Sequence, residues 1–219
     1  MRTVIAKMSS VAEFWTVVVL AFGFFICSST LGFFKGHSRA LSNGWALSLV
    51  AFELAILVVV AWIGHVRGWS LRKLGLQPSW RLTGAGVLLW VATNVILGAT
   101  YAVVSATMGR IPDPAITAGT LSFWAVVLVS LVNPVFEETL VVGYVVEKTS
   151  AHGAVFAITA SALLRFLYHT YQGPIAAVYI LPLGLIFAAV YVHYRALWAL
   201  IVAHAIMNLI GLGRLLHPS

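Results

Sequence analysis

Seven long apolar stretches constrain the fold of this chain more than any other feature of its sequence. Each is close to the ~20 apolar residues that a helix needs to cross the hydrocarbon core of a bilayer. Membrane-spanning strands would alternate in hydropathy, whereas these stretches are continuous. The sequence therefore predicts an all-α, polytopic helical membrane protein with about seven to eight transmembrane helices and a buried polar site. The stretches are residues 12–34, 44–65, 83–107, 121–146, 154–171, 174–193 and 197–216.

The composition excludes the main alternatives to a membrane protein. The chain has 219 residues, of which 61% are hydrophobic and 9% charged, and its mean hydropathy is +1.00. In a soluble domain about a quarter of the residues are charged, so a soluble domain and a disordered chain are both excluded. The single cysteine excludes a disulfide scaffold. We expect one transmembrane domain over residues 1–219.

The net charge of +7 predicts an orientation in the membrane. The basic residues are spread thinly between apolar stretches, which is not the pattern of a nucleic-acid binder, so the expected partner is the lipid bilayer. With the N-terminus inside, eight basic residues face the cytoplasm and four face outward, which fits the positive-inside rule. The compact size and the lack of eukaryotic retention signals favour a bacterial cytoplasmic membrane. The eight are Arg2, Lys7, Arg67, Arg72, Lys73, Arg81, Lys148 and Arg195.

The six acidic residues are the positions to follow, because a carboxylate inside a bilayer is costly and usually functional. Glu13, Asp113 and Glu147 lie at or beyond the ends of apolar stretches, and we expect them to be solvated. Glu53 lies nearer the middle of the stretch 44–65. It can be either a hydrogen-bonding residue of the packing or a distant part of a site.

Glu137 and Glu138 lie among apolar residues in the stretch 121–146. Two ionised neighbours at that depth would repel and be costly to desolvate, so a cation or polar cavity must hold them, or one must be neutral. Adjacent helical residues point about 100° apart, which predicts different partners and different roles for the two. Because Pro134 disfavours helix at Asn133, we expect a kink or break that leaves the pair in the first turn of a half-helix. The alternative is a structural carboxylate pair.

Two further polar pairs share helix faces at a spacing of four residues. One is Arg165 with His169, and the other is His204 with Asn208. The neighbours of the second pair are apolar, so both its side chains must face protein or water.

Two carboxylates, two imidazoles and an amide on three helices form a set suited to hydrolysis. A carboxylate can deprotonate a water that an imidazole orients, and an imidazole with an amide can donate to the developing oxyanion. The same side chains, taken as Glu137, His169 and His204, could instead hold a divalent metal such as zinc that activates the water. The sequence lacks the H-E-x-x-H motif of zinc proteases. The spacing of these residues does not distinguish the metal-dependent mechanism from the metal-free one.

The order of these clusters resembles the CPBP family, which contains the CAAX proteases and the bacteriocin-processing (Abi) intramembrane proteases. The resemblance covers about residues 121–212. The first family motif is E-E-x-x-x-R followed by Gly. Residues 137–143 match it, except that Val142 stands where Arg is expected. The second motif, F-x-x-x-H, ends at His169, with Arg165 in the Phe position. The third motif, a His followed four residues later by Asn, is intact.

The resemblance implies an intramembrane endopeptidase that cuts a peptide or a membrane-bound protein. It implies that Glu137 activates the water with His169, that His204 and Asn208 stabilise the oxyanion, and that Glu138 supports the site. Both metal-dependent and metal-free mechanisms are argued for the family. We favour no cofactor, because the reading from the residues needs none. A prenylated substrate, as for CAAX proteases, would require an opening to the lipid.

The two departures from the family motifs suggest a single explanation. The missing Arg would lie one turn after Glu138 as its counter-ion, and we hypothesise that Arg165 supplies this charge from a facing helix. The alternative is a catalytically inactive family member that acts as an immunity, regulatory or scaffold protein in the membrane. A proton-coupled carrier is a third candidate, disfavoured by the small size and the lack of repeats.

The helix lengths place a further demand on the fold. His169 lies 21 residues beyond Lys148 and Glu138 only ten before it, so equal depth in the membrane requires an interruption between them. We expect residues 147–156 to form a loop, with the next helix beginning near residue 157. We also expect residues 171–174 to line a cavity or a re-entrant break.

Overall fold

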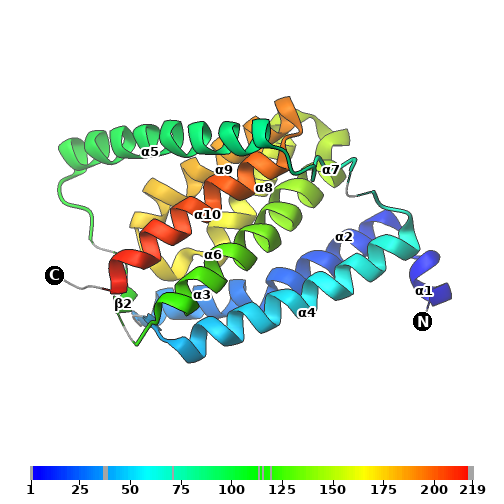
Figure 1. Ribbon diagram of the computed structural model, residues 1–219, viewed down its shortest axis with the longest axis horizontal. Coiled ribbons are helices and arrows are strands. Elements are labelled where there is room, and N and C mark those ends of the chain that lie inside the picture. Colours follow the sequence, from blue (N-terminus) through cyan, green and yellow to red (C-terminus); the bar gives the residue numbers. More distant parts are fainter. Residues whose placement is uncertain are drawn as a thin grey trace.

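Helices make up most of the computed structural model of the protein (Figure 1). The structure describes residues 2–36, 39–70, 72–112, 114, 116–118 and 120–216, and Asp113 lies outside them. Within this part, six segments are long and apolar enough to cross a membrane: Ser10–Lys35, Asn43–Arg67, Trp80–Met108, Phe123–His152, Ile175–Tyr194 and Leu197–Leu216. A seventh apolar helix is shorter. The predicted helical membrane fold is confirmed.

The first half of the chain forms three long helical segments. The short helix α1 (Arg2–Ala6) precedes α2 (Ser10–Val18), which continues through a π-helical turn η1 (Val19–Gly23) into α3 (Phe24–Lys35). A strand β1 (Arg39–Leu41) leads to α4 (Asn43–Arg67) and α5 (Trp80–Met108). Ser9, Ser42 and Ser79 begin α2, α4 and α5 as N-caps, each accepting a backbone N–H with its hydroxyl.

The second half carries the predicted site. It contains β2 (Ile116–Ala118), α6 (Phe123–Glu137), the π-helix η2 (Glu138–Tyr144), α7 (Val145–Thr149) and the 3₁₀ turn η3 (Ser150–His152). These are followed by α8 (Ala154–Tyr168), the 3₁₀ turn η4 (Thr170–Gln172), α9 (Ile175–Tyr194), α10 (Leu197–Gly213) and the 3₁₀ turn η5 (Arg214–Leu216). The segment Phe123–His152 is the most buried of the candidate spans.

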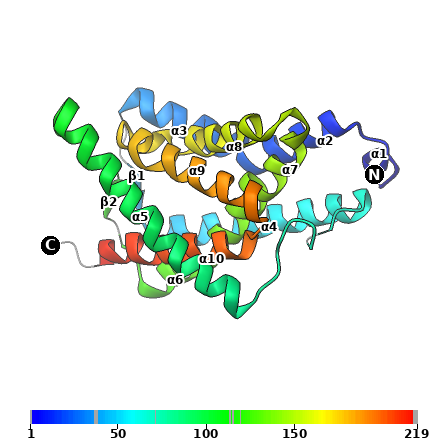
Figure 2. The same cartoon turned by 90° about the horizontal axis from the view of Figure 1, so that it is seen from above.

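The helices form two layers, and the segment Phe123–His152 passes from one to the other. Figure 2 shows α4, α6 and α10 on one side, α3, α8 and α9 on the other, and α5 crossing them at an angle. Helix α6 packs between α4 and α10, whereas α7 packs against α8. The π-helix η2 connects α6 to α7 and lies between the layers, which places Glu138 in the centre of the molecule.

The chain shows no break at Pro134. Helix α6 runs through Asn133 and Pro134 to Glu137, and the N–H of Glu138 bonds to the carbonyls of Pro134 and Val135. The expected half-helix start, with free N–H groups for the carboxylates, is therefore wrong. Proline removes only its own hydrogen bond, and packing in a membrane helix tolerates that loss. The irregularity lies just after the proline, where η2 widens the helix over seven residues.

The stretch predicted at residues 154–171 is a helix too short to span. α8 has 15 residues, which is about 22 Å against a hydrocarbon core of ~30 Å. The expected loop at 147–156 is wrong, because helical structure continues to His152 and α8 starts at Ala154. The chain turns at Gly153, whose φ of +97° suits glycine. Helix α8 then ends inside the bundle, where η4 packs against α3.

A short parallel strand pair joins the two halves of the chain near one end of the bundle. Arg39 pairs with Ile116 and Leu41 with Ala118. The Asn43 side-chain oxygen accepts the N–H of Ser122 at 2.8 Å, which fixes the starts of α4 and α6 together. The pair thus ties the segment before α4 to the segment before α6.

Candidate active site

A cavity of about 270 Å³ lies between the two layers. Its polar wall includes most of the residues predicted from the motifs, together with others that the motifs did not indicate, and its remaining wall is largely apolar. Glu137 lines the cavity, whereas Glu138 does not and is fully buried. The polar lining residues are Glu53, Asn133, Glu137, Arg165, Tyr168, His169, Tyr171, Gln172, His204 and Asn208. Residues 171 and 172 therefore line a cavity, as expected.

Arg165 holds the two carboxylates together. Its Nη2 donates to both oxygens of Glu138, at 2.7 and 2.8 Å, and its Nη1 donates to Oε2 of Glu137 at 3.2 Å. The guanidinium is only 1% exposed, and it lies over the ring of Phe187 with 5.8 Å to the ring centroid. The contact hypothesised between Arg165 and Glu138 is thus present. Val142 is buried in an apolar cluster that also contains Phe187.

The two carboxylates have different partners, as their positions on adjacent helical residues predict. Glu137 Oε2 also accepts the hydroxyl of Tyr168 at 2.7 Å, and its Oε1 accepts Nδ2 of Asn133 at 3.0 Å. Glu138 Oε1 accepts Nδ1 of His204 at 2.5 Å. Glu138 is therefore held from α8 and α10, while Glu137 is held at the cavity wall.

The two residues of the third motif lie on one face of α10. Nδ1 of His204 is used by Glu138, so Nε2 is the ring nitrogen left for the cavity that His204 lines. Asn208 donates one N–H to Oδ1 of Asn133 at 2.9 Å and keeps a second N–H. The spacing of four residues thus brings an imidazole and an amide to the same cavity.

His169 lies at the end of α8, and a backbone carbonyl determines which of its ring nitrogens carries the hydrogen. Its Nδ1–H donates to the carbonyl of Arg165 at 3.0 Å. In the neutral ring, Nε2 is then an acceptor. His169 lines the cavity beside Tyr171 and Gln172, and its ring lies 4.5 Å from that of Tyr168.

Three residues join the site that the motifs did not indicate as members. Glu53 of α4 lines the cavity and accepts Nδ2 of Asn133 at 2.7 Å. Asn133 bonds to Glu53, Glu137 and Asn208, and Tyr168 bonds to Glu137. The sequence did indicate Glu53 as a candidate, because it is an acid in the middle of an apolar stretch. Tyr168 carried none, because tyrosine is common in membrane helices.

Glu13 is not solvated, which corrects the prediction from its position at a membrane edge. It is 1% exposed and pairs with Arg67 and Lys148, each at 2.6 Å. The hydroxyl of Tyr144 also donates to it, at 3.3 Å. Burial is tolerated because two cations and a hydroxyl replace the water. Glu147, by contrast, is exposed and pairs with Arg195.

Three of the described residues could hold a divalent metal. The acidic and histidine side chains whose ligand atoms lie within 4.8 Å of one another are Glu137, Glu138 and His204. Glu138 thus takes the place that the sequence predicted for His169. The Arg165 guanidinium already occupies both oxygens of Glu138 and one of Glu137. A metal ion there would lie against a buried positive charge.

The fold and the cavity define a class, that of helical membrane proteins with a polar cavity between their helices. Residues 119–210 match the family model described as type II CAAX prenyl endopeptidase Rce1-like. The predicted resemblance to the CPBP and CAAX protease family is thus confirmed over these 92 residues, which make up less than half of the chain. The match begins and ends two residues before the range 121–212 over which the motifs resemble the family. Comparison with curated proteins and with solved structures found no match.

Proposed function

We propose that the protein is an active intramembrane endopeptidase that hydrolyses a peptide bond without a metal. One observation carries this proposal: Glu137 lines the cavity together with His169, His204 and Asn208, while Glu138 lies behind it and pairs with Arg165 and His204. One carboxylate is therefore available to a substrate, and the other is committed to structure.

Glu137 acts as the general base. A water in the cavity gives its proton to the Glu137 carboxylate as its oxygen adds to the scissile carbonyl carbon. His169 orients this water, because its free Nε2 can accept a hydrogen bond from the other O–H of the water. Tyr168, Asn133 and Arg165 fix the carboxylate in place.

His204 and Asn208 stabilise the oxyanion. Nδ1 of His204 lies against Glu138, which leaves Nε2 facing the cavity. With a hydrogen on each ring nitrogen, His204 donates Nδ1–H to Glu138 and Nε2–H to the oxyanion. The second N–H of Asn208 is the other donor. When the C–N bond breaks, the leaving nitrogen takes the proton that Glu137 accepted from water, which restores the base.

The apolar part of the cavity wall supports a membrane-bound substrate. The apolar lining residues include Phe25, Trp45, Leu49 and Leu212, together with Leu41 of β1. Together with the description of the matched family, this supports a prenylated C-terminal CAAX peptide as substrate. A non-prenylated peptide or membrane protein tail is the alternative substrate.

The test is cleavage by the purified protein of a fluorogenic peptide in two forms, farnesylated and unmodified. We expect cleavage, with a preference for the farnesylated form, that is unaffected by a metal chelator. Glu137→Gln and His204→Ala should each lower kcat by about 100-fold or more. Glu147→Gln and His152→Ala change exposed residues and serve as matched controls that keep full activity.

Two other outcomes of this experiment would change the proposed function or the proposed mechanism. If the folded wild-type protein cleaves neither peptide under any condition, the inactive family member with a regulatory or immunity role is favoured instead. Loss of activity with the chelator and recovery with zinc would overturn the metal-free mechanism but keep the protease.

A further inference from the structure

Asn133 connects three helices at the centre of the cavity wall. Its Nδ2 donates to Glu53 on α4 at 2.7 Å and to Glu137 on its own helix at 3.0 Å. Its Oδ1 accepts Nδ2 of Asn208 on α10 at 2.9 Å. Both amide hydrogens and the amide oxygen are thus in use, and the side chain is buried.

These contacts fix which way the amide points. Nδ2 lies between two carboxyl oxygens, and Oδ1 faces a donor. In the flipped orientation the Asn133 oxygen would face the oxygen of Glu137, and its nitrogen would face the Nδ2 of Asn208. Asn133 therefore holds the carboxylate of Glu137 and the amide of Asn208 in one arrangement.

Glu53 lies in surroundings that favour a neutral carboxylic acid. It is 1% exposed, and its Oε2 has no hydrogen-bond partner. Among the described residues, no lysine, arginine or histidine forms an ion pair with it, whereas every other glutamate has such a partner. The nearest charged group across Asn133 is the carboxylate of Glu137, which repels a second negative charge.

We propose that Glu53 keeps its proton and acts with Asn133 as a positioning pair, which sets the base Glu137 and the oxyanion donor Asn208 at a fixed separation. This inference rests on the proposed function, because it assigns the roles of Glu137 and Asn208 from it. Glu53 lies on α4, outside the matched segment 119–210, and its hydrogen bond with Asn133 links this helix to the polar residues of that segment.

The substitutions at Glu53 separate a neutral acid from a charged one. Glu53→Gln keeps an acceptor for Asn133 without a charge, so we expect kcat within about threefold of the wild type. Glu53→Leu leaves one N–H of Asn133 without a partner, so we expect kcat to fall about tenfold or more with little change in KM. If Glu53→Gln is as damaging as Glu53→Leu, the carboxylate works in its charged form and the proposal is wrong.

A double-mutant cycle tests whether Asn133 acts through Asn208. Asn133→Ala should lower kcat by about tenfold or more, and adding Asn208→Ala should cost much less than it does alone. Independent residues would instead give losses that multiply. The matched control is Asn94→Ala, because Asn94 is exposed on α5 and bonds only to the carbonyl of Trp90 in its own helix.

Infrared spectroscopy tests the proton on Glu53 without any activity assay. The wild type should show the C=O stretch of a protonated carboxylic acid at neutral pH, and Glu53→Gln should remove it, whereas Glu147→Gln should not. Absence of the band would overturn the proposal even in an active enzyme. If the band is present but no peptide is cleaved, the proposed function fails while the protonation of Glu53 stands.

Discussion

At the scale of the residue, the site depends on one guanidinium that comes from an unexpected helix. The family motif expects an Arg one turn after Glu138, where this chain has Val142. Arg165 reaches the same carboxylate from α8 and also contacts Glu137. A buried carboxylate pair needs a nearby positive charge, and the helix that supplies it is of secondary importance.

Replacing Arg165 tests this relocation. Arg165→Phe leaves two buried carboxylates without their shared cation, so we expect a loss of about 3–5 kcal/mol in the free energy of unfolding and loss of activity. Adding Val142→Arg should restore part of both, because position 142 lies one helical turn after Glu138 and belongs to the same apolar cluster as Phe187, over which the Arg165 guanidinium lies. Thermal unfolding in detergent measures the first effect and peptide cleavage the second. A silent Arg165→Phe variant would contradict the assignment.

Tyr168 gives a second prediction at this scale. Tyr168→Phe removes the hydroxyl that Glu137 Oε2 accepts and keeps the ring, which stacks on Phe22. We expect kcat to fall about tenfold, because the Glu137 carboxylate loses one of the hydrogen bonds that hold it in place. The melting temperature should change little, because the ring and its packing are kept. Tyr194→Phe is the matched control, since that residue is exposed. An equal effect of the two substitutions would remove Tyr168 from the site.

At the scale of the element, close helix contacts depend on individual glycines. Gly86 of α5 faces α10, and a Cβ there would lie 2.7 Å from the carbonyl oxygen of Ala199 and 2.7 Å from the Cβ of Val202. Gly84, one half-turn away, has no atom within 4 Å of such a Cβ. The packing of α5 against α10 therefore needs a glycine at position 86 but not at position 84 (Figure 2).

This pair provides a matched test of how α5 is attached. Gly86→Val forces α5 away from α10 and should cost about 1–3 kcal/mol, seen as a lower melting temperature. Gly84→Val points away from this contact and should leave the melting temperature nearly unchanged. If the two variants melt alike, the observed packing of α5 on α10 is wrong.

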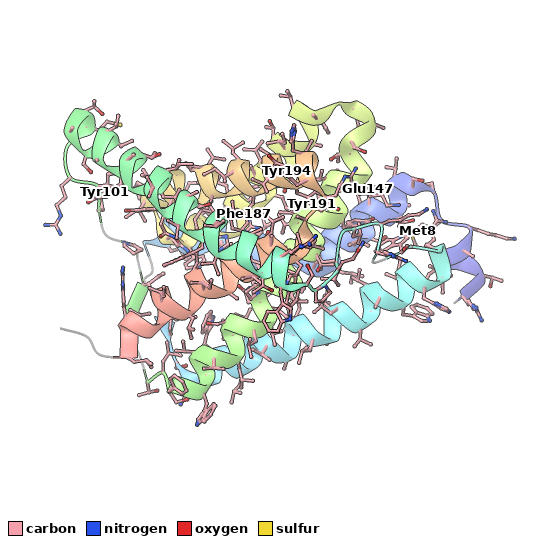
Figure 3. The ribbon with its side chains drawn as sticks, turned by 45° about the horizontal axis from the view of Figure 1, so that its top comes forward. Met8, Tyr101, Glu147, Phe187, Tyr191 and Tyr194 are labelled. Carbon is pink, nitrogen blue, oxygen red and sulfur yellow. The ribbon has the colours of Figure 1, made fainter. Side chains whose placement is uncertain are left out.

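At the scale of the whole molecule, charged pairs gather at one end of the bundle. Glu13 joins Arg67 and Lys148 there, which ties the first and second helical segments to the family segment. Glu147 pairs with Arg195 at the same end. Figure 3 shows Tyr191 and Tyr194 near Glu147, with Tyr101 at the opposite side of the molecule.

Removing one charge from each pair should have unequal effects. Glu13→Gln leaves two cations around a buried position and should cost about 2 kcal/mol of stability. Glu147→Gln breaks an exposed pair and should cost less than about 1 kcal/mol. Unfolding in detergent measures both. A larger effect of Glu147→Gln would show that burial of Glu13 is not what makes its pairing matter.

The orientation in the membrane is a further prediction at this scale. Arg67 and Lys148 both pair with Glu13, near the start of the chain. Arg195 pairs with Glu147, the residue next to Lys148. We predict that this end faces the cytoplasm, because clustered cations are retained on that side. A protease-sensitive tag on the N-terminus should be cut in inverted vesicles and protected in right-side-out ones. The reverse result would invert the assignment.

The sequence by itself determined the membrane class, the helical fold and the order of the polar clusters. Apolar stretches long enough to span a bilayer leave the backbone no alternative to helices, and buried carboxylates are too costly to occur without a purpose. Spacings of four residues also placed His204 with Asn208 correctly on one face, because that relation is local.

Only the tertiary structure decided which residues meet. The roles of Glu53 and Asn133 depend on α4 packing against α6, which no local pattern encodes. Pro134 was expected to break its helix, but neighbouring helices support the chain and the distortion moves into η2. The burial of Glu13 depends on cations from two distant segments. The cost of a buried charge is set by its partners, and these are known only once the helices are in place.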